Sequence, residues 1–329
     1  MIINNVNCRF GSSNPKTAYF EPNNSLIDQT SRANRIFRDQ GAGFRLGLML
    51  PERFNFRRAR KLKIGIHAAS LGNQRIDIVM GVMARRLLKM ANDLKTTPAE
   101  LIKSTPDAVR KALNYVGQSV RLSASDVDPR IVKLGQEGTV HYYGQEAEQY
   151  KNPPKDYFSR LFATTTPKEL TPLIPVIDEL YRSLVTEPSN VSFIVDPKGA
   201  ITSTNYTKLR RVMGPLRQAD AFQEVTRSSQ KQSDVLVSAN WLPYFLADPH
   251  ELPKNIDGVR TYLAKATEII KPGGLLVLGG LDISTGLPAL LPKGRFQPIR
   301  DKSLLIEKAA ANLNPVDATK ESYIFERIA

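Results

Sequence analysis

Polar residues that could hold a ligand follow apolar segments at several points along the chain. The first such segment leads into a run of small residues, Ala68–Gly72, and the second ends at Asp126. Asp220 stands beside an aromatic residue, and Asn240 and Tyr244 follow a further apolar segment. Small residues let the backbone approach a ligand closely, and a carboxylate after a strand can accept hydrogen bonds from ribose hydroxyls. The succession of these positions predicts a nucleotide-type site.

Each position also has a purely structural interpretation. A small-residue turn is common in α/β packing, and Asp126 could assist the cap of a helix that starts at Asp128-Pro129. Asp220 alone fits a solvated loop acid, and Tyr244 alone fits a core or interface aromatic. The prediction of a ligand site therefore depends on the order of these residues, and both interpretations stay open for each of them.

The elements that would position these residues alternate between strands and helices. Strands are predicted over 61–67, 119–124, 191–195, 233–238 and 275–278, with further candidates at 303–307 and 323–326. Helices are predicted over 73–92, 169–184, 206–213 and 256–270, with shorter ones inside 97–115. The helix over 73–92 has apolar residues every three or four positions, which is typical of one buried face. This alternation predicts an α/β fold with a largely parallel sheet and helices on both faces.

The pattern also suggests how the chain is divided. Residues 1–25 form an irregular N-terminal segment, and 26–60 hold a helix followed by a basic linker. The main domain runs over 61–308 with an insertion at about 143–205, and 309–329 form a C-terminal extension.

Composition limits the function classes. The chain has 46 Lys and Arg against 32 Asp and Glu, a net charge of +14. This excess favours acidic partners such as an acidic protein or nucleic acid, although it also aids solubility alone. A single Cys and three His argue against a disulfide framework and against a metal site. No apolar run approaches the ~20 residues of a membrane helix, and no signal peptide is apparent, so a cytoplasmic location is expected.

Several short blocks occur in a fixed order: 36–39 (IFRD), Leu50-Pro51 with 67–74 (HAASLGNQ), 124–127 (ASDV) with 135–142 (GQEGTVHY), 233–245 (SDVLVSANWLPYF) and 270–279 (IKPGGLLVLG). In identity and spacing they resemble the motifs of the CheR-type chemotaxis-receptor methyltransferases, which esterify receptor glutamates. The resemblance runs from about Phe37 to Lys308 and diverges at 93–117 and 143–205. It implies a Rossmann-like class I methyltransferase fold, with a mostly parallel seven-stranded sheet, and S-adenosylmethionine as the cofactor.

The resemblance also implies roles for single residues. The cofactor-binding set comprises Ala68, Ser70, Gly72, Gln74, Asp126, Asp220 and Asn240. Within it, Asp126 would hold the ribose, Asp220 would lie near the adenine and Asn240 would support the methionine part. Arg38 and Tyr244 would flank the methyl group and the incoming carboxylate, and they are the candidate catalytic residues.

The chain also departs from the family pattern. Ala68 replaces a loop glycine, Asn73-Gln74 replace an acidic pair, Ala239 replaces an arginine, and few residues are available before Phe37 for the family's N-terminal helical domain. Three hypotheses follow. The first is an active methyltransferase with an unidentified acceptor, such as a protein carboxylate. The second is a catalytically inactive binding or scaffolding protein on the same fold. The third is a nucleic-acid-binding or nucleic-acid-modifying protein, favoured by the net charge.

Overall fold

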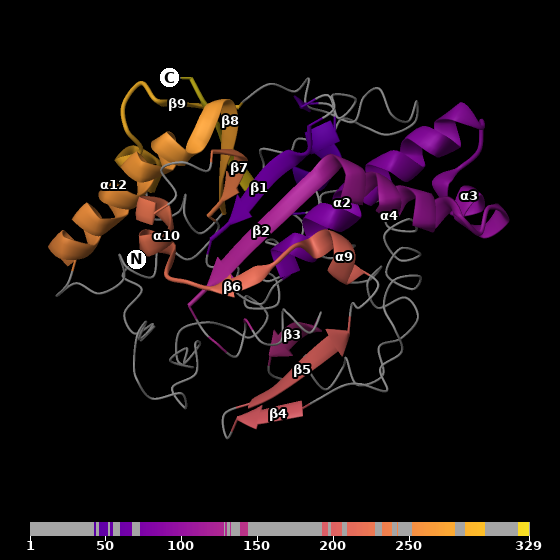
Figure 1. The fold of residues 1–329 in the computed structure, drawn as a ribbon, viewed down its shortest axis with the longest axis horizontal. Coiled ribbons are helices and arrows are strands. Elements are labelled where there is room, and N and C mark those ends of the chain that lie inside the picture. Colours follow the sequence, from indigo (N-terminus) through magenta and orange to yellow (C-terminus); the bar gives the residue numbers. More distant parts are fainter. Residues whose placement is uncertain are drawn as a thin grey trace.

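The protein is described from a computed structural model (Figure 1). The described residues are 43, 46–51, 53–54, 60–67, 73–127, 129, 132, 139–143, 193–196, 199–205, 209–227, 232–238, 242, 252–279, 287–299 and 322–328. Statements about structure below concern these residues.

A seven-stranded sheet forms the centre of the molecule, in the order β6-β2-β1-β7-β8-β10-β9. Its strands are β1 (Leu62–Ile66), β2 (Val120–Asp126), β6 (Leu216–Gln218), β7 (Ser233–Val237), β8 (Ile270–Gly279), β9 (Phe296–Pro298) and β10 (Ser322–Arg327). The first five strands pair in parallel, and β10 runs antiparallel to both β8 and β9. Counted along the chain, the parallel strands follow the order 3-2-1-4-5 of a Rossmann sheet. The expected α/β, Rossmann-like, mostly parallel seven-stranded fold is thus confirmed.

Helices cover both faces of this sheet (Figure 1). One face packs against α2 (Asn73–Asp93), α3 (Pro98–Ser104), α4 (Ala108–Ser119) and α9 (Arg210–Met213). The other packs against α10 (Ala221–Arg227), α12 (Leu252–Ile269) and the 3-10 turn η4 (Leu287–Leu290). An apolar core fills each face of the sheet: the first core lies under α2, α3, α4 and α9, and the second under α10, α12 and η4. Side chains alternate along β7, so that Val235 and Val237 lie in the first core and Leu236 lies in the second. Two apolar cores therefore hold the strands in place.

Residues 46–51 are helical and 46–50 are buried, although they fall in the stretch expected to be a basic linker. Leu46, Leu48 and Leu50 belong to the first core. A side chain at Gly47 would come within 2.3 Å of the carbonyl oxygen of Ile78 on α2. The glycine thus permits a close helix contact, and this part of the linker prediction is wrong.

A second glycine sets the path into β6. Gly214 has a φ of 66° and would place a Cβ 2.0 Å from the carbonyl oxygen of Leu122 on β2. The turn before β6 therefore lies directly against the neighbouring strand. Arg75 of α2 donates to the Gly214 carbonyl at 3.3 Å, which ties the turn to the first helical layer as well.

Three antiparallel strands form a separate small sheet in the order β3-β5-β4: β3 (Thr139–Tyr143), β5 (Gly199–Asn205) and β4 (Phe193–Asp196). In Figure 1 this small sheet lies below β6 in the view. Its strands stand at the two ends of the insertion expected at about 143–205.

The strand expected at 323–326 is confirmed as β10. Because β10 pairs with β8 over Ser322–Glu326, with Ile324 and Phe325 buried, this part of the chain belongs to the sheet. The sheet thus extends into the segment expected to be a C-terminal extension, and that expectation is corrected for β10. The helix expected over 169–184 and the strand expected over 303–307 lie outside the described residues.

No helix in the described ranges combines the length and the apolar character needed to cross a bilayer.

Candidate functional site

The order of the parallel strands fixes where a ligand would bind. The chain passes from β1 outward through β2 to β6, and then restarts on the other side of β1 with β7 and β8. In sheets of this kind ligands bind beyond the carboxyl ends of the strands, where the order reverses. That position lies between the ends of β1 and β7, which are joined by a bond from the backbone N–H of His67 to the carbonyl oxygen of Val237 at 3.0 Å.

Asp126 is the last residue of β2 and is fully buried. Its backbone carbonyl accepts a hydrogen bond from the N–H of Ala219 at 2.9 Å. The side-chain amide of Gln218 donates to the carbonyl of Val127 at 3.4 Å. These bonds hold the end of β2 against the segment that leads into Asp220, so the two expected cofactor acids come from neighbouring strand ends.

Asp220 caps the amino end of α10. Its Oδ1 accepts hydrogen bonds from the backbone N–H groups of Phe222 at 2.7 Å and of Gln223 at 3.1 Å. Its backbone carbonyl accepts the N–H of Glu224 at 2.9 Å. A side-chain oxygen at this position satisfies N–H groups that have no partner inside the helix. The carboxylate is thus held in a fixed place at the edge of the sheet.

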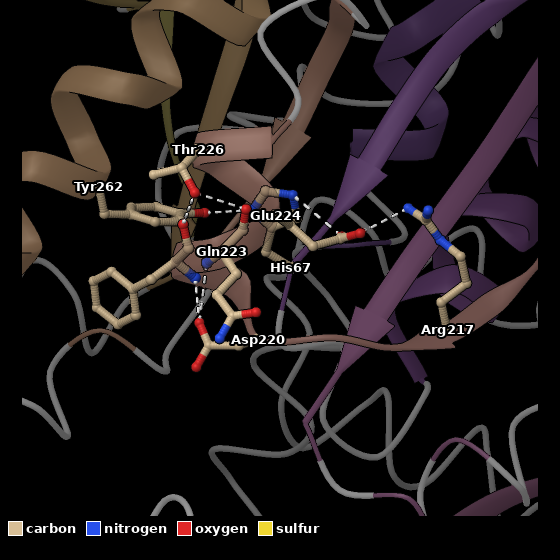
Figure 2. Close-up of polar contacts among 8 residues, drawn as sticks. His67, Arg217, Asp220, Gln223, Glu224, Thr226 and Tyr262 are labelled. Carbon is tan, nitrogen blue, oxygen red and sulfur yellow. Dashed lines mark hydrogen bonds and ion pairs between the residues drawn. The ribbon is translucent and has the colours of Figure 1, made fainter.

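A buried histidine stands at the end of β1. His67 is 6% exposed, and its Nδ1 lies 2.8 Å from the hydroxyl oxygen of Tyr262 on α12. Its Nε2 lies 3.9 Å from Oε2 of Glu224, whose Oε1 pairs with Arg217 at 2.9 Å. Figure 2 shows His67 between Tyr262 and Glu224, with Arg217 on the far side of the glutamate. We call these four residues the His67 array.

Burial lowers the pKa of His67 from 6.5 to about 4. Desolvation of the charged imidazolium is the main cause; the negative charge of Glu224 opposes it, and the positive charge of Arg217 adds to it. His67 is therefore neutral at pH 7, and its contact with Glu224 is not an ion pair there. The nearby carboxylate favours the tautomer with hydrogen on Nε2, which leaves Nδ1 to accept the Tyr262 hydroxyl proton.

Ser125, next to Asp126, is also fully buried. Its hydroxyl oxygen has no hydrogen-bond partner within the part of the chain that the structure describes. An unsatisfied buried hydroxyl costs about 1–3 kcal/mol, so it calls for an explanation. Ser125 lies at the carboxyl end of β2, the end of the strands at which sheets of this type bind ligands.

The structure describes only part of the site expected from the sequence. It brings Asp126 and Asp220 together, and it places Gln74 in the first turn of α2 without describing its side chain. The remaining expected residues, Arg38, Ala68, Ser70, Gly72, Asn240 and Tyr244, lie outside the described residues. Among those described, no group of three or more His, Cys, Asp or Glu could hold a metal ion.

Sequence reasoning missed the His67 array. His67 is the last residue of the strand predicted over 61–67, so its position was a usable signal. Glu224 and Tyr262 gave no such signal, because each sits on a helix whose register with β1 is known only from the fold.

Comparisons with known proteins give a limited result. No family model matches the chain, and no curated protein matches it. Among solved structures, the chain is similar to the N-methyltransferase NodS from Bradyrhizobium japonicum WM9, with 10% identity and a TM-score of 0.29. The match covers 86% of this chain and 97% of that one.

Proposed function

We propose that the chain is an S-adenosylmethionine-dependent methyltransferase of the CheR-like type, acting on an acidic protein with a carboxylate as methyl acceptor. The observation that supports this most is the meeting of Asp126 and Asp220 at neighbouring strand ends, one strand from the reversal of strand order. The seven-stranded, mostly parallel sheet is the fold that the motif resemblance implies.

The described residues fit this cofactor at two points. A buried carboxylate at the end of β2 can accept hydrogen bonds from two vicinal ribose hydroxyls. Asp220, held by the first turn of α10, is proposed to lie near the adenine. Ala68, Ser70, Gly72, Gln74 and Asn240 are proposed to complete the binding site on the strength of the motif resemblance alone.

Little further chemistry is required of the protein. When bound, the cofactor supplies an activated methyl group on a sulfonium. The chain would bind and orient both reactants, and such positioning contributes much of the rate of a group transfer. A carboxylate acceptor is already ionised at neutral pH, so it needs no general base. Arg38 is proposed to orient it by paired hydrogen bonds, and Tyr244 to flank the methyl group.

The test is calorimetric titration with S-adenosylhomocysteine, comparing the wild type with Asp126→Asn, Asp126→Ala and a control, Asp257→Asn. Asp257 is a solvent-exposed aspartate on α12. We expect both Asp126 variants to lose affinity about a hundredfold, as two hydrogen bonds to a charged group would predict, and the control to bind like the wild type. Equal affinities in all variants would remove Asp126 from the site, and a wild type that binds nothing at millimolar ligand would refute the proposal.

Catalysis itself is tested at Tyr244. If the residue acts on the reacting groups, Tyr244→Phe slows methyl transfer more than it weakens cofactor binding. Equal losses would assign Tyr244 to binding or packing. A wild type that binds the cofactor without transferring methyl to any carboxylate-rich protein tested would favour the inactive binding protein, which the substitutions Ala68, Gln74 and Ala239 also suggest.

A further inference from the structure

His67 and Arg217, the two array residues contributed by the sheet, lie at one level across it. Ser125 on β2 is the register partner of Arg217 on β6. Ile66 pairs with Ala124 on one side and with Val237 on the other, so His67, the next residue, lies level with Ser125 and Ser238. The side chain of His67 points to the face covered by α10 and α12, where it meets Glu224 and Tyr262.

The array, together with Phe222, joins four elements. The Tyr262 hydroxyl links α12 to the end of β1, and the ion pair of Arg217 with Glu224 links β6 to α10. The rings of Phe222 and Tyr262 meet edge to face, with centroids 5.7 Å apart, which links α10 to α12. The rings of His67 and Tyr262 also meet edge to face, at 5.9 Å. His67, Tyr262 and Glu224 therefore each contact two neighbouring side chains.

Two residues of α10 connect the array to Asp220. The Glu224 side chain belongs to the array and the Phe222 ring packs against Tyr262, while the backbone N–H groups of both residues bond to Asp220. A shift of either side chain would therefore move a group that holds Asp220. This connection runs through covalent bonds and through the hydrogen bonds of 2.7 Å and 2.9 Å to Asp220.

We propose that His67 and Tyr262 are positioning residues, which set the place of Asp220 beside Asp126 through Phe222 and Glu224. Neither would touch the ligand; both would act through α10. This inference rests on the proposed function only in naming the cofactor as the ligand, since the geometry concerns the protein alone.

The test uses variants that remove single contacts. Glu224→Gln removes the charge that Arg217 pairs with, and its matched control is Glu268→Gln, an exposed glutamate of α12 paired with Lys265. Tyr262→Phe removes one hydroxyl and keeps the ring, and its matched control is Tyr115→Phe on α4. His67→Leu removes both ring nitrogens, whereas His67→Asn keeps an acceptor near the position of Nδ1.

The first measurement needs no ligand: amide hydrogen exchange at Phe222 and Gln223, with the buried amides of α4 as an internal reference. We expect exchange about tenfold faster than in the wild type for Glu224→Gln, Tyr262→Phe and His67→Leu, with α4 unchanged. We expect the two controls to match the wild type and His67→Asn to restore most of the protection. Acceleration of α4 by the same factor would show general destabilisation and would overturn the proposal.

The second measurement is the affinity for S-adenosylhomocysteine under conditions where each variant is fully folded. A loss of about tenfold is expected, equivalent to about 1.4 kcal/mol, with rescue by His67→Asn. If the wild type binds and the array variants bind equally tightly with unaltered exchange, the positioning role is refuted. If the wild type does not bind, the proposed cofactor is wrong, and the exchange rates alone decide whether the array positions Asp220.

Discussion

The pKa of His67 predicts how the stability of the protein depends on pH. In the unfolded chain the imidazole binds a proton near pH 6.5, whereas burial lowers its pKa in the folded protein to about 4. Between these values the unfolded state binds more protons than the folded state, so the free energy of unfolding falls as the pH is lowered. The contribution is complete above about pH 7 and is lost on the acidic side.

The size of this effect follows from the two values. Linkage gives a loss of about 1 kcal/mol at about pH 5.5, about 2 kcal/mol at about pH 5, and at most about 3 kcal/mol below pH 4. Carboxylates elsewhere also titrate in this range, but their contributions are common to the wild type and a variant that lacks the imidazole. The quantity to measure is therefore the difference between the wild type and His67→Asn.

The assay is urea unfolding of both proteins at several values between about pH 7.5 and about pH 4.5. The wild type should lose stability relative to His67→Asn as the pH falls, with the slope steepest below about pH 6. Nitrogen-15 spectra give an independent reading, because the chain has only three histidines and His67→Asn identifies the missing signal. Parallel stability curves, or a His67 signal that titrates near pH 6.5, would refute the buried neutral imidazole.

Two further predictions concern the framework of the site. Gly214→Ala should lower the free energy of unfolding by several kcal/mol more than Gly294→Ala. Both glycines have nearly the same positive φ, but only at Gly214 would the added Cβ meet a backbone oxygen, that of Leu122. Equal losses in thermal unfolding would show that the turn before β6 shifts to accommodate the methyl group. Asp234→Asn should cost about 2 kcal/mol, because its carboxylate bonds two cationic side chains and a backbone amide. The exposed Asp257→Asn is its control in chemical unfolding, and matching midpoints would contradict that role.

Long apolar patterns made the central elements predictable. The strands at β1 and β7 and the helix α2 appear within about two residues of the ranges expected from the sequence. Residues 271–274 (KPGG), which separate the helix expected over 256–270 from the strand expected over 275–278, lie within β8, where the pairing with β7 shifts register between Ser233 and Val235. Gly273 has a φ of 73°, so the backbone departs from extended geometry at this residue, but the strand continues through it.

Short elements were not predictable. The strand β6 has three residues and the helix α10 has seven, too few for a periodic pattern to stand out. Their places are set by pairing with β2 and by the cap at Asp220, which are tertiary features. Residues 46–51 were misassigned for a related reason: glycines suggested a linker, whereas Gly47 allows a close contact with α2.

The order of the motifs along the chain led to the expectation that Asp126 and Asp220 belong to one site, but the strand β6, which brings Asp220 to the end of β2, was not predicted. The His67 array required more than strand order. Its hydrogen bond joins residues 195 positions apart in the sequence. No pattern within a single segment specifies which helix residue will face the end of β1.

Asp234 and Ser125 are buried polar residues near opposite ends of the sheet, and their side chains differ in their hydrogen bonds. At the amino ends of the strands, the buried carboxylate of Asp234 is bonded by Arg60 at 2.8 Å, by Lys271 at 2.6 Å and by the N–H of Lys63 at 2.7 Å. At the carboxyl ends, Ser125 keeps a buried hydroxyl with no partner among the described residues, and His67 is kept neutral by burial.

Apolar residues at these carboxyl-end positions would avoid both costs, and an interior that serves stability alone tends to satisfy its polar groups. Buried polar groups without a partner in the protein are expected where a ligand supplies the missing hydrogen bond. Although Arg53 Nε near the other end of the sheet is likewise buried without a partner among the described residues, the unpartnered Ser125 hydroxyl is a reason to test the carboxyl ends of β1 and β2 for ligand binding. Both the enzyme and a non-catalytic binding protein on this fold would require it, so the ligand titration at Asp126 comes before any test of methyl transfer.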